Sequence, residues 1–303
     1  MATLTAQFYE LLEADQKQIF FNEFTMQPEI WPSLFESVPS TKAYEDRMRI
    51  AGFGTLATKA EGTPIAFDSP VQGTKARTVH STFGLGWRAS MEMMMDDQHG
   101  VMSKMSKDLA LAAKDHRERL AWSLIDDGFD GNTYTGLEGD TLFEDSHVSI
   151  RDPSISQSNI LSPPVALGVT GLESMMTLAR TTRSDEGRYI NLTQSILCIH
   201  PDLEHQAYQL LNTEFETDTN NNNVSTVKSS RSGLKPILVP YKSSSTSWSI
   251  HAPVGQNSLT WNNRMDVEFD TAGDPVTRDL QSFVFYRASV MFSEWRGNYG
   301  SNF

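Results

Sequence analysis

The longest amphipathic pattern in the chain lies in residues 96–128 and predicts one long helix. Apolar residues recur at steps of three and four between Val101 and Ile125, which places them on one continuous helical face. Neither proline nor glycine interrupts this run, and at about 1.5 Å per residue the helix would be roughly 40 Å long. Asp97 suits a helix N-terminus. The opposite face is polar and is expected to face water: Lys104, Lys107, Asp108, Lys114, Asp115 and Glu118.

A second amphipathic pattern spans residues 5–25 and predicts an N-terminal helix, which Pro28 and Pro32 would end. Two interpretations stay open for the aromatic residues in and just after this helix. In the first, they pack in the core. In the second, they belong to an arm that lies on a neighbouring subunit, because terminal segments stay ordered only when they contact another structure. The candidate arm contacts are Phe20, Phe24, Trp31 and Phe35.

Residues 50–88 differ from the helical segments in composition, because glycine and proline interrupt runs rich in Thr, Val, Ile and Phe. We expect strands at 53–59 and 78–83, joined through turn-forming residues at 68–73, and hence a long antiparallel loop. A hairpin of two strands alone is only marginally stable in water, so we expect this loop to pack against another part of the chain or against another subunit. Its charged residues suit a polar contact at the rim of an interface: Lys59, Glu61, Asp68, Lys75 and Arg77.

The segment after the long helix, residues 126–149, is loop-like and rich in carboxylates. Counted from Asp126, the calcium-loop pattern fails at its third position, Gly128. It fails again at its twelfth, Leu137, where a bidentate glutamate is required. We therefore expect a solvated loop without a metal. General acid and base catalysis by two carboxylates of residues 126–145 remains an alternative.

The rest of the chain mixes short helices with strands and predicts an α/β segment followed by a returning strand. Two adjacent prolines at 163–164 mark its beginning, and the returning strand lies at 283–292. Between them we expect helices and strands at 172–179, 195–200, 201–211, 236–241 and 246–250.

Composition describes a folded protein. The 303 residues are 39% hydrophobic and 21% charged, and the single cysteine, Cys198, excludes an internal disulfide framework. Neither a bilayer-length apolar run nor a secretory signal pattern is present. The net charge of −13 disfavours tight binding to nucleic-acid phosphates.

Motifs that carry chemistry are missing from the sequence. It lacks a phosphate-binding loop, paired Cys-x-x-Cys, His-Glu-x-x-His and Gly-x-Ser-x-Gly. His116 falls on the apolar face of the long helix, where we expect a hydrogen-bonded core histidine. The sequence therefore predicts no catalytic residue, no cofactor and no metal ligand.

Short motifs flank the predicted elements in a distinctive order. They are Phe-Gly-Leu-Gly-Trp at 83–87, Asp-Gly-Phe at 127–129, Ile-His-Pro at 199–201 and Trp-Arg-Gly-Asn-Tyr-Gly at 295–300. The order of parts resembles tailed-phage major capsid proteins of the Hong Kong 97-type fold, and the motifs look most like the Mu-type major head subunit family.

This resemblance implies an α+β fold with an N-terminal arm, an extended β-hairpin loop, a long spine helix, a peripheral domain and an axial domain. The arm would be residues 1–49 and the extended loop 50–88. The peripheral domain with its spine helix would be 89–164 and 281–303, and the axial domain 165–280.

The implied function is a structural subunit of an icosahedral viral head, in which pentamers and hexamers enclose double-stranded DNA that they contact non-specifically. The protein would be made in the host cytoplasm and reside in the virion, without a membrane. Implied partners are a separate scaffolding protein, a portal and a possible cement protein. Some relatives cross-link a loop lysine to a neighbour's asparagine, and Lys59 and Lys75 are placed for it. We do not expect it here, because no catalytic acid is evident. Alternatives are an encapsulin-like nanocompartment shell and, less favoured, the hydrolase that uses the 126–145 carboxylates.

Overall fold

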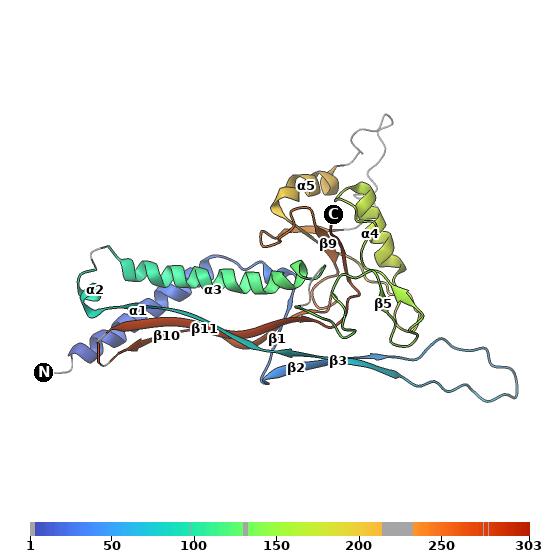
Figure 1. Cartoon of the computed structure of the whole chain (residues 1–303), viewed down its shortest axis with the longest axis horizontal. Helices are drawn as coiled ribbons and strands as arrows, with labels where there is room; N and C mark the ends of the chain where they lie inside the picture. The colour runs from blue at the N-terminus through green and yellow to red at the C-terminus, as the bar shows by residue number, and fades with distance from the viewer. Residues whose placement is uncertain (1–3, 98, 130–132, 214–232, 275, 278) are drawn as a thin grey trace.

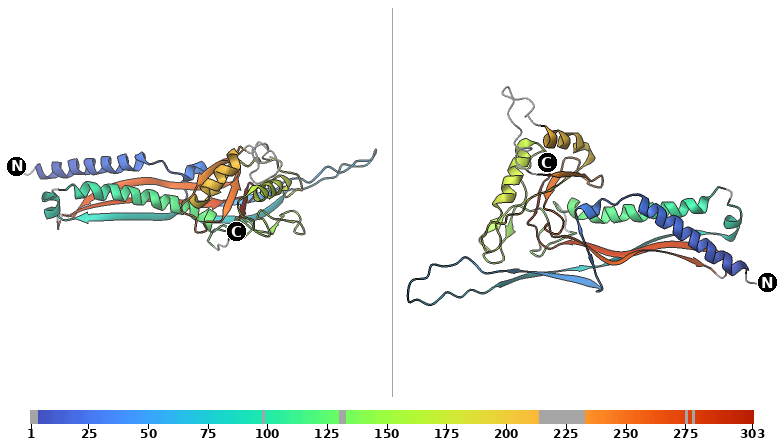
Figure 2. Two further views of the ribbon diagram at one scale, coloured as in Figure 1. Left: turned by 90° about the horizontal axis from the view of Figure 1, so that it is seen from above. Right: turned by 180° about the vertical axis from the view of Figure 1, so that it is seen from behind.

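The structure is a computed structural model that describes residues 4–97, 99–129, 133–213, 233–274, 276–277 and 279–303. An elongated body lies along the longest axis, a second unit stands on one end of it, and a hairpin loop projects beyond that end (Figure 1). The N-terminus lies at the opposite end of the body (Figure 2). Within the described residues, no helix combines the length and hydropathy that crossing a membrane requires.

The body is a four-stranded sheet covered by two helices. The sheet has the order β1 (Glu36–Pro39), β10 (Leu259–Gly273), β11 (Leu280–Phe292) and β4 (Ser81–Ala89). The β1–β10 pair is parallel, and the other two pairs are antiparallel. Helix α1 (Leu4–Met26) packs against helix α3 (Val101–Asp126) and β10, while α3 also packs on β11 and β4.

The long helix predicted from the apolar pattern is confirmed as α3. The Asp97 carboxylate accepts hydrogen bonds from the backbone N–H groups of Val101 and Met102, at 2.9 and 3.2 Å. These bonds lower the pKa of Asp97 and satisfy donors at the helix N-terminus. The prediction that the polar side of this helix faces water is wrong at Lys114 and Glu118, which are 8% and 6% exposed. They are buried because the segment that contains α1 and the residues after it covers this side of α3.

The second unit is built on a smaller sheet with the order β12 (Asn298–Ser301), β9 (Trp248–His251), β7 (Ile196–Ile199) and β8 (Lys235–Leu238). Helices α4 (Val169–Thr181) and α5 (Glu204–Asn212) accompany it, with a 3₁₀ turn, Pro201–Leu203, before α5. This unit has its own apolar core, in which Leu172, Trp248 and Tyr299 are almost completely buried.

The expected domain boundaries differ from the structure at two elements. Strand β10 was expected within 165–280, but it pairs with β11 in the sheet of the body. Strand β12 was expected with 281–303 in the body, but it pairs with β9 in the second unit. Pairing between distant strands decides both placements, and the local sequence pattern carries no information about the partner strand.

The extended loop, expected at residues 50–88, is a hairpin of residues 44–79. It is formed by β2 (Tyr44–Ala51) and β3 (Val71–Val79), joined by residues 52–70, which have no strand, while β4 belongs to the sheet of the body. The expected strand at 53–59 is therefore wrong, and part of the expected turn at 68–73 belongs to β3. The expected strand at 78–83 is divided at His80 between β3 and β4, because β4 is recruited by β11. The remaining short elements are Trp31–Ser33, α2 (Met91–Met95), β5 (His147–Val148) and β6 (Ser156–Gln157).

Candidate subunit-contact surfaces

The projecting loop exposes several large apolar side chains. Leu56 and Phe67 are 102% and 97% exposed, and Phe53 and Ile65 are 58% and 68% exposed. Removing such a side chain from water is worth about 1.5–3 kcal/mol, and grouped exposed apolar residues mark contact surfaces. Sequence reasoning selected the charges of this loop and missed these residues. The available signal was the recurrence of large apolar residues between closely spaced glycines and prolines.

Two of the five charges expected at the loop's rim are brought together on one carboxylate. The Asp46 carboxylate pairs with Lys75 Nζ at 2.6 Å and with Arg77 Nε at 2.7 Å, across the β2–β3 ladder. Hydrogen bonds from Arg77 and Lys75 lower the pKa of Asp46 to about 2. The Arg77 guanidinium also lies 3.8 Å from the Tyr44 ring centroid. These charges therefore stabilise the hairpin from within.

Asp68 also has its partner within the chain. Its carboxylate pairs with the guanidinium of Arg151 and accepts the Gly54 N–H at 2.8 Å, and these bonds lower the pKa of Asp68 to about 2. Lys59 and Glu61 are exposed. Three of the five predicted rim residues thus serve the hairpin and its attachment, and an interface role for any of the five stays a prediction.

A partly buried ionic cluster holds the root of the loop. Arg49 on β2 pairs with Glu138, with Asp185 at 3.1 Å and with Glu294 at 2.9 Å. Arg296 pairs with the same Asp185 and Glu294, at 3.1 and 2.9 Å. Because these five residues come from segments far apart in sequence, the cluster ties β2 to both structural units.

The aromatic residues proposed for the arm lie mainly in the chain's own core. Phe20 stacks on Phe269 with ring centroids 4.8 Å apart, and Trp31 stacks on Trp261 at 4.5 Å. Phe35 makes an edge-to-face contact with Trp122, with ring centroids 6.0 Å apart. All three predicted rings are at most 4% exposed, so they are not accessible to a neighbouring subunit in this fold. Phe24 is partly buried against the same core.

His116 and its surroundings form a groove between α3 and the sheet, with a volume of about 400 Å³. The expectation of a core histidine is wrong, because the side chain is exposed. Its expected hydrogen bond is present, between Nδ1 and the Tyr286 hydroxyl at 2.6 Å. Partial desolvation of the ring in the groove lowers the pKa of His116, and the groove is otherwise mainly apolar, with Phe83 packed against His116.

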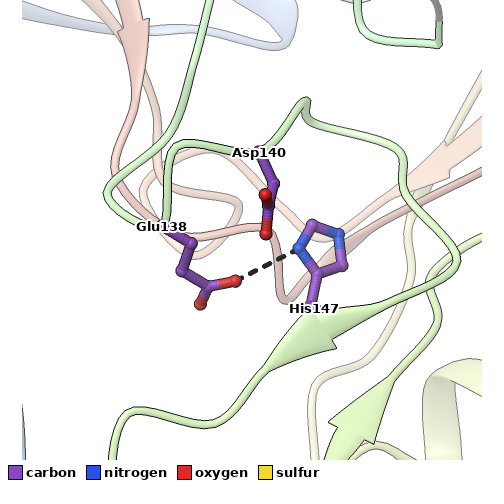
Figure 3. A group of neighbouring side chains, drawn as sticks. All are labelled: Glu138, Asp140 and His147. Carbon is purple, nitrogen blue, oxygen red and sulfur yellow. Dashed lines mark hydrogen bonds and ion pairs between the residues drawn. The ribbon is translucent and has the colours of Figure 1, made fainter. Parts of the chain in front are cut away.

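Carboxylates of the segment 126–149 make contacts at two places among the described residues. The Asp126 carboxylate accepts the backbone N–H and the hydroxyl of Ser243, at 2.8 and 3.0 Å. Glu138, Asp140 and His147 do converge, as Figure 3 shows, with one candidate ligand atom from each lying within 4.8 Å of the others. The cavity beside them has a volume of about 10 Å³, which suits the centre of about one water molecule.

The chain matches a family model described as phage capsid protein over residues 74–299. A comparison with curated proteins finds no match. Among similar solved structures, the procapsid of bacteriophage JBD30 has a TM-score of 0.52 and 14% sequence identity, with 100% of this chain and 76% of that chain covered. The capsid of the native GTA particle has a TM-score of 0.57 and 10% identity, with coverages of 89% and 88%.

A third similar structure is the holo-SrpI encapsulin complex from Synechococcus elongatus. It has a TM-score of 0.51 and 10% identity, with 91% of this chain and 87% of that chain covered. At such identities the structural likenesses show the fold alone. They confirm the predicted α+β fold of tailed-phage capsid proteins, while a particular closeness to the Mu-type subunits stays a prediction.

Proposed function

The chain belongs to the phage capsid protein family, and from this premise we propose that its pentamers and hexamers close an icosahedral head around double-stranded DNA. The protein is a structural subunit of a viral shell and resides in the virion. The observation that supports the proposed assembly most directly is the extended loop. It carries Leu56 and Phe67 almost wholly exposed, on a hairpin that projects away from both cores.

The geometry favours contacts between different surfaces of successive subunits. A projecting loop and the surface that receives it lie at different places on one chain, so the contact is heterologous and propagates until the assembly closes. Each contact can be weak, because every subunit makes several at once and simultaneous engagement multiplies them. The 26-residue helix α3 supplies a stiff frame for these contacts. The net charge of −13 keeps binding to the enclosed DNA weak and non-specific.

Further partners follow from the same proposal. A shell of this kind needs a means to set its size and a vertex through which DNA enters. We therefore expect a separate scaffolding protein and a portal, with a cement protein as a possible addition, and synthesis in the host cytoplasm. The protein acts without enzymatic chemistry in this proposal. The arm, extended-loop, peripheral and axial roles are proposed with β10 placed in the body and β12 in the second unit.

The proposal is tested by expressing the chain alone and together with its neighbouring reading frames. Electron microscopy and light scattering should show closed particles of uniform size. A species that stays monomeric under every assembly condition would contradict the proposal.

An encapsulin-like nanocompartment is the second candidate, because an encapsulin complex shares the fold. The family match favours the phage head. Nucleic-acid content separates the two: particles from infected cells should contain double-stranded DNA, whereas a nanocompartment would contain an enzyme. The structure disfavours the hydrolase alternative. The Asp126 carboxylate accepts a hydrogen bond from Ser243, and the cavity beside Glu138 is far smaller than a substrate.

Covalent cross-linking between subunits is not part of the proposal. Both lysines are exposed, but Lys75 is paired with Asp46 inside its own hairpin, which makes Lys59 the better candidate of the two. Boiled particles should run as a single monomer band on a denaturing gel, and a ladder of multiples would show cross-linking.

A further inference from the structure

Glu138, Asp140 and His147 converge, as Figure 3 shows. They lie at the root of the extended loop, because Glu138 pairs with Arg49 on β2. The two carboxylates come from the loop after α3, and His147 begins β5. His147 is only 2% exposed, and its ring stacks on the Trp295 indole with centroids 4.4 Å apart and planes 6° apart. The orientation of the imidazole is therefore fixed by packing.

Hydrogen bonds around Asn159 determine which nitrogen of His147 carries a proton. The Asn159 side-chain N–H₂ donates to the carbonyl oxygens of Leu142 and Asn298, at 2.6 and 2.9 Å. Its Oδ1 accepts the Glu144 N–H at 2.8 Å and lies 3.2 Å from His147 Nε2. Because this oxygen can only accept, Nε2 is the nitrogen that bears the hydrogen.

In a neutral ring, Nδ1 of His147 therefore presents a lone pair. It faces Glu138 Oε2 at 3.3 Å, and an ionised carboxylate can only accept as well. Two acceptors aimed at one another inside the protein need a cation between them, either a second proton on His147 or a metal ion. An oxygen of the Asp140 carboxylate lies close to this pair, within 4.8 Å of the ligand atoms of Glu138 and His147.

The charges around this spot favour a divalent ion. The carboxylates of Glu138, Asp185 and Glu294 pair with the guanidiniums of Arg49 and Arg296, and the Asp140 carboxylate lies beside Glu138, so four negative charges meet two positive ones. A monovalent proton would leave this cluster negative, whereas a divalent cation would neutralise it. The cavity of about 10 Å³ beside these side chains can hold about one water molecule or ion.

We propose that Glu138, Asp140 and His147 bind one divalent transition-metal ion of the zinc class. The ligands are His147 Nδ1 and one oxygen of each carboxylate. A donor set that joins imidazole nitrogen to carboxylate oxygen suits zinc, whereas calcium and magnesium prefer oxygen alone. Asn159 supplies the outer hydrogen bond that orients a ligating histidine.

The position of the site indicates a structural role. Glu138 uses its other oxygen, Oε1, to pair with Arg49 on β2. A bound ion would therefore brace the loop after α3 against the strand from which the extended loop emerges. This inference does not depend on shell assembly, because the site lies within one chain.

Zinc binding to the full-length protein tests the proposal. Protein dialysed against a chelator is titrated with Zn²⁺ by calorimetry, and the metal content of the reloaded protein is measured. We expect one ion per chain in the wild type. Asp140→Asn should weaken binding by about tenfold or more, since it removes a ligand without breaking an ion pair of Arg49. Asp145→Asn removes the same charge from an exposed position on the same loop and should bind like the wild type.

Nitrogen NMR of the unassembled subunit separates the metal from the proton. With Zn²⁺ present, the Nδ1 resonance of His147 should shift while Nε2 keeps its hydrogen. The proposal is overturned if the wild type binds no zinc, or if Asp140→Asn and Asp145→Asn bind it equally. It is also overturned if both nitrogens of His147 remain protonated in the presence of zinc. Because soluble subunits suffice for these measurements, a failure of the metal site is distinguishable from a failure of assembly.

Discussion

The N-terminal region and the extended loop both carry large apolar side chains, yet the fold treats them in opposite ways. Phe20 and Trp31 are 0% and 4% exposed, whereas Leu56 and Phe67 are 102% and 97% exposed. The rings of the N-terminal region find partners on β10, in a body where two helices lie over a four-stranded sheet. The exposed residues of the loop lie in the connection 52–70 at the end of a two-stranded ribbon, where the described residues form no covering layer.

This difference shows where the chain's apolar surface is already used and where it remains for another molecule. A two-stranded ribbon has no interior, so apolar side chains placed on it stay in water until something outside covers them. We therefore infer that the N-terminal rings stabilise the folded subunit, whereas the loop's apolar residues contact another molecule. The predictions below test that division.

The largest expected effect is on folding, from a ring of the N-terminal region. Trp31→Ala removes the indole stacked on Trp261 and should lower the free energy of unfolding by about 3–5 kcal/mol. Urea denaturation of the unassembled subunit measures this, with Leu56→Ala as the control that should change it by less than about 0.5 kcal/mol. If both variants lowered the free energy of unfolding equally, the two regions would not differ in their contribution to folding.

The root of the loop should respond almost as strongly. Arg49→Met removes the guanidinium that pairs with Glu138 and leaves Asp185 and Glu294 with Arg296 alone, and it should cost about 3 kcal/mol in the same unfolding measurement. Arg77→Met, which removes an exposed guanidinium from the same hairpin, should have a much smaller effect. If Arg49→Met is neutral, the ionic cluster does not fix the loop to the body.

Apolar residues of the loop should affect assembly and leave folding unchanged. Leu56→Ser combined with Phe67→Ser removes two exposed side chains, each worth about 1.5–3 kcal/mol if buried in a contact. The protein concentration needed for particle formation, followed by light scattering, should rise steeply, while urea denaturation stays as in the wild type. Thr58→Ser in the same loop is the matched control. Assembly at the wild-type concentration would show that the loop's apolar residues contact nothing.

The sequence predicted those features that depend on one local period. Helix α3 was found because its buried face repeats every three to four residues, and Asp97 because helix N-termini favour carboxylates. Residues 53–59 have strand-forming composition but no partner strand, so they stay irregular. The burial of Glu118 depends on contacts with Ile30 and Trp122, one of them far away in sequence. The Glu138–Asp140–His147 cluster escaped because a search for contiguous calcium-loop spacing cannot detect ligands that the chain brings together by folding back.

The smallest expected effect concerns the charges of the hairpin and appears as a dependence on pH. Arg77 and Lys75 lower the pKa of Asp46 from 3.8 to about 2. A lowered folded-state pKa means that the ion pairs stabilise the hairpin fully above about pH 4. This contribution is lost as the pH falls from 3.8 towards 2. Because Asp46 and its partners are solvent-accessible, the effect on the whole subunit should be slight, and it is best observed at the carboxyl group itself.

Carbon NMR of the Asp46 carboxyl group should give a titration midpoint near 2 in the wild type. Arg77→Met should raise the midpoint towards 3.8, whereas Arg88→Met, whose guanidinium pairs with Asp279, should leave it unchanged. A wild-type midpoint near 3.8 would mean that Lys75 and Arg77 are not held by Asp46 in solution. These charges would then be available to a neighbouring subunit, and the loop would offer both charged and apolar contacts. A low midpoint instead assigns the charges to the hairpin and leaves association to its apolar residues.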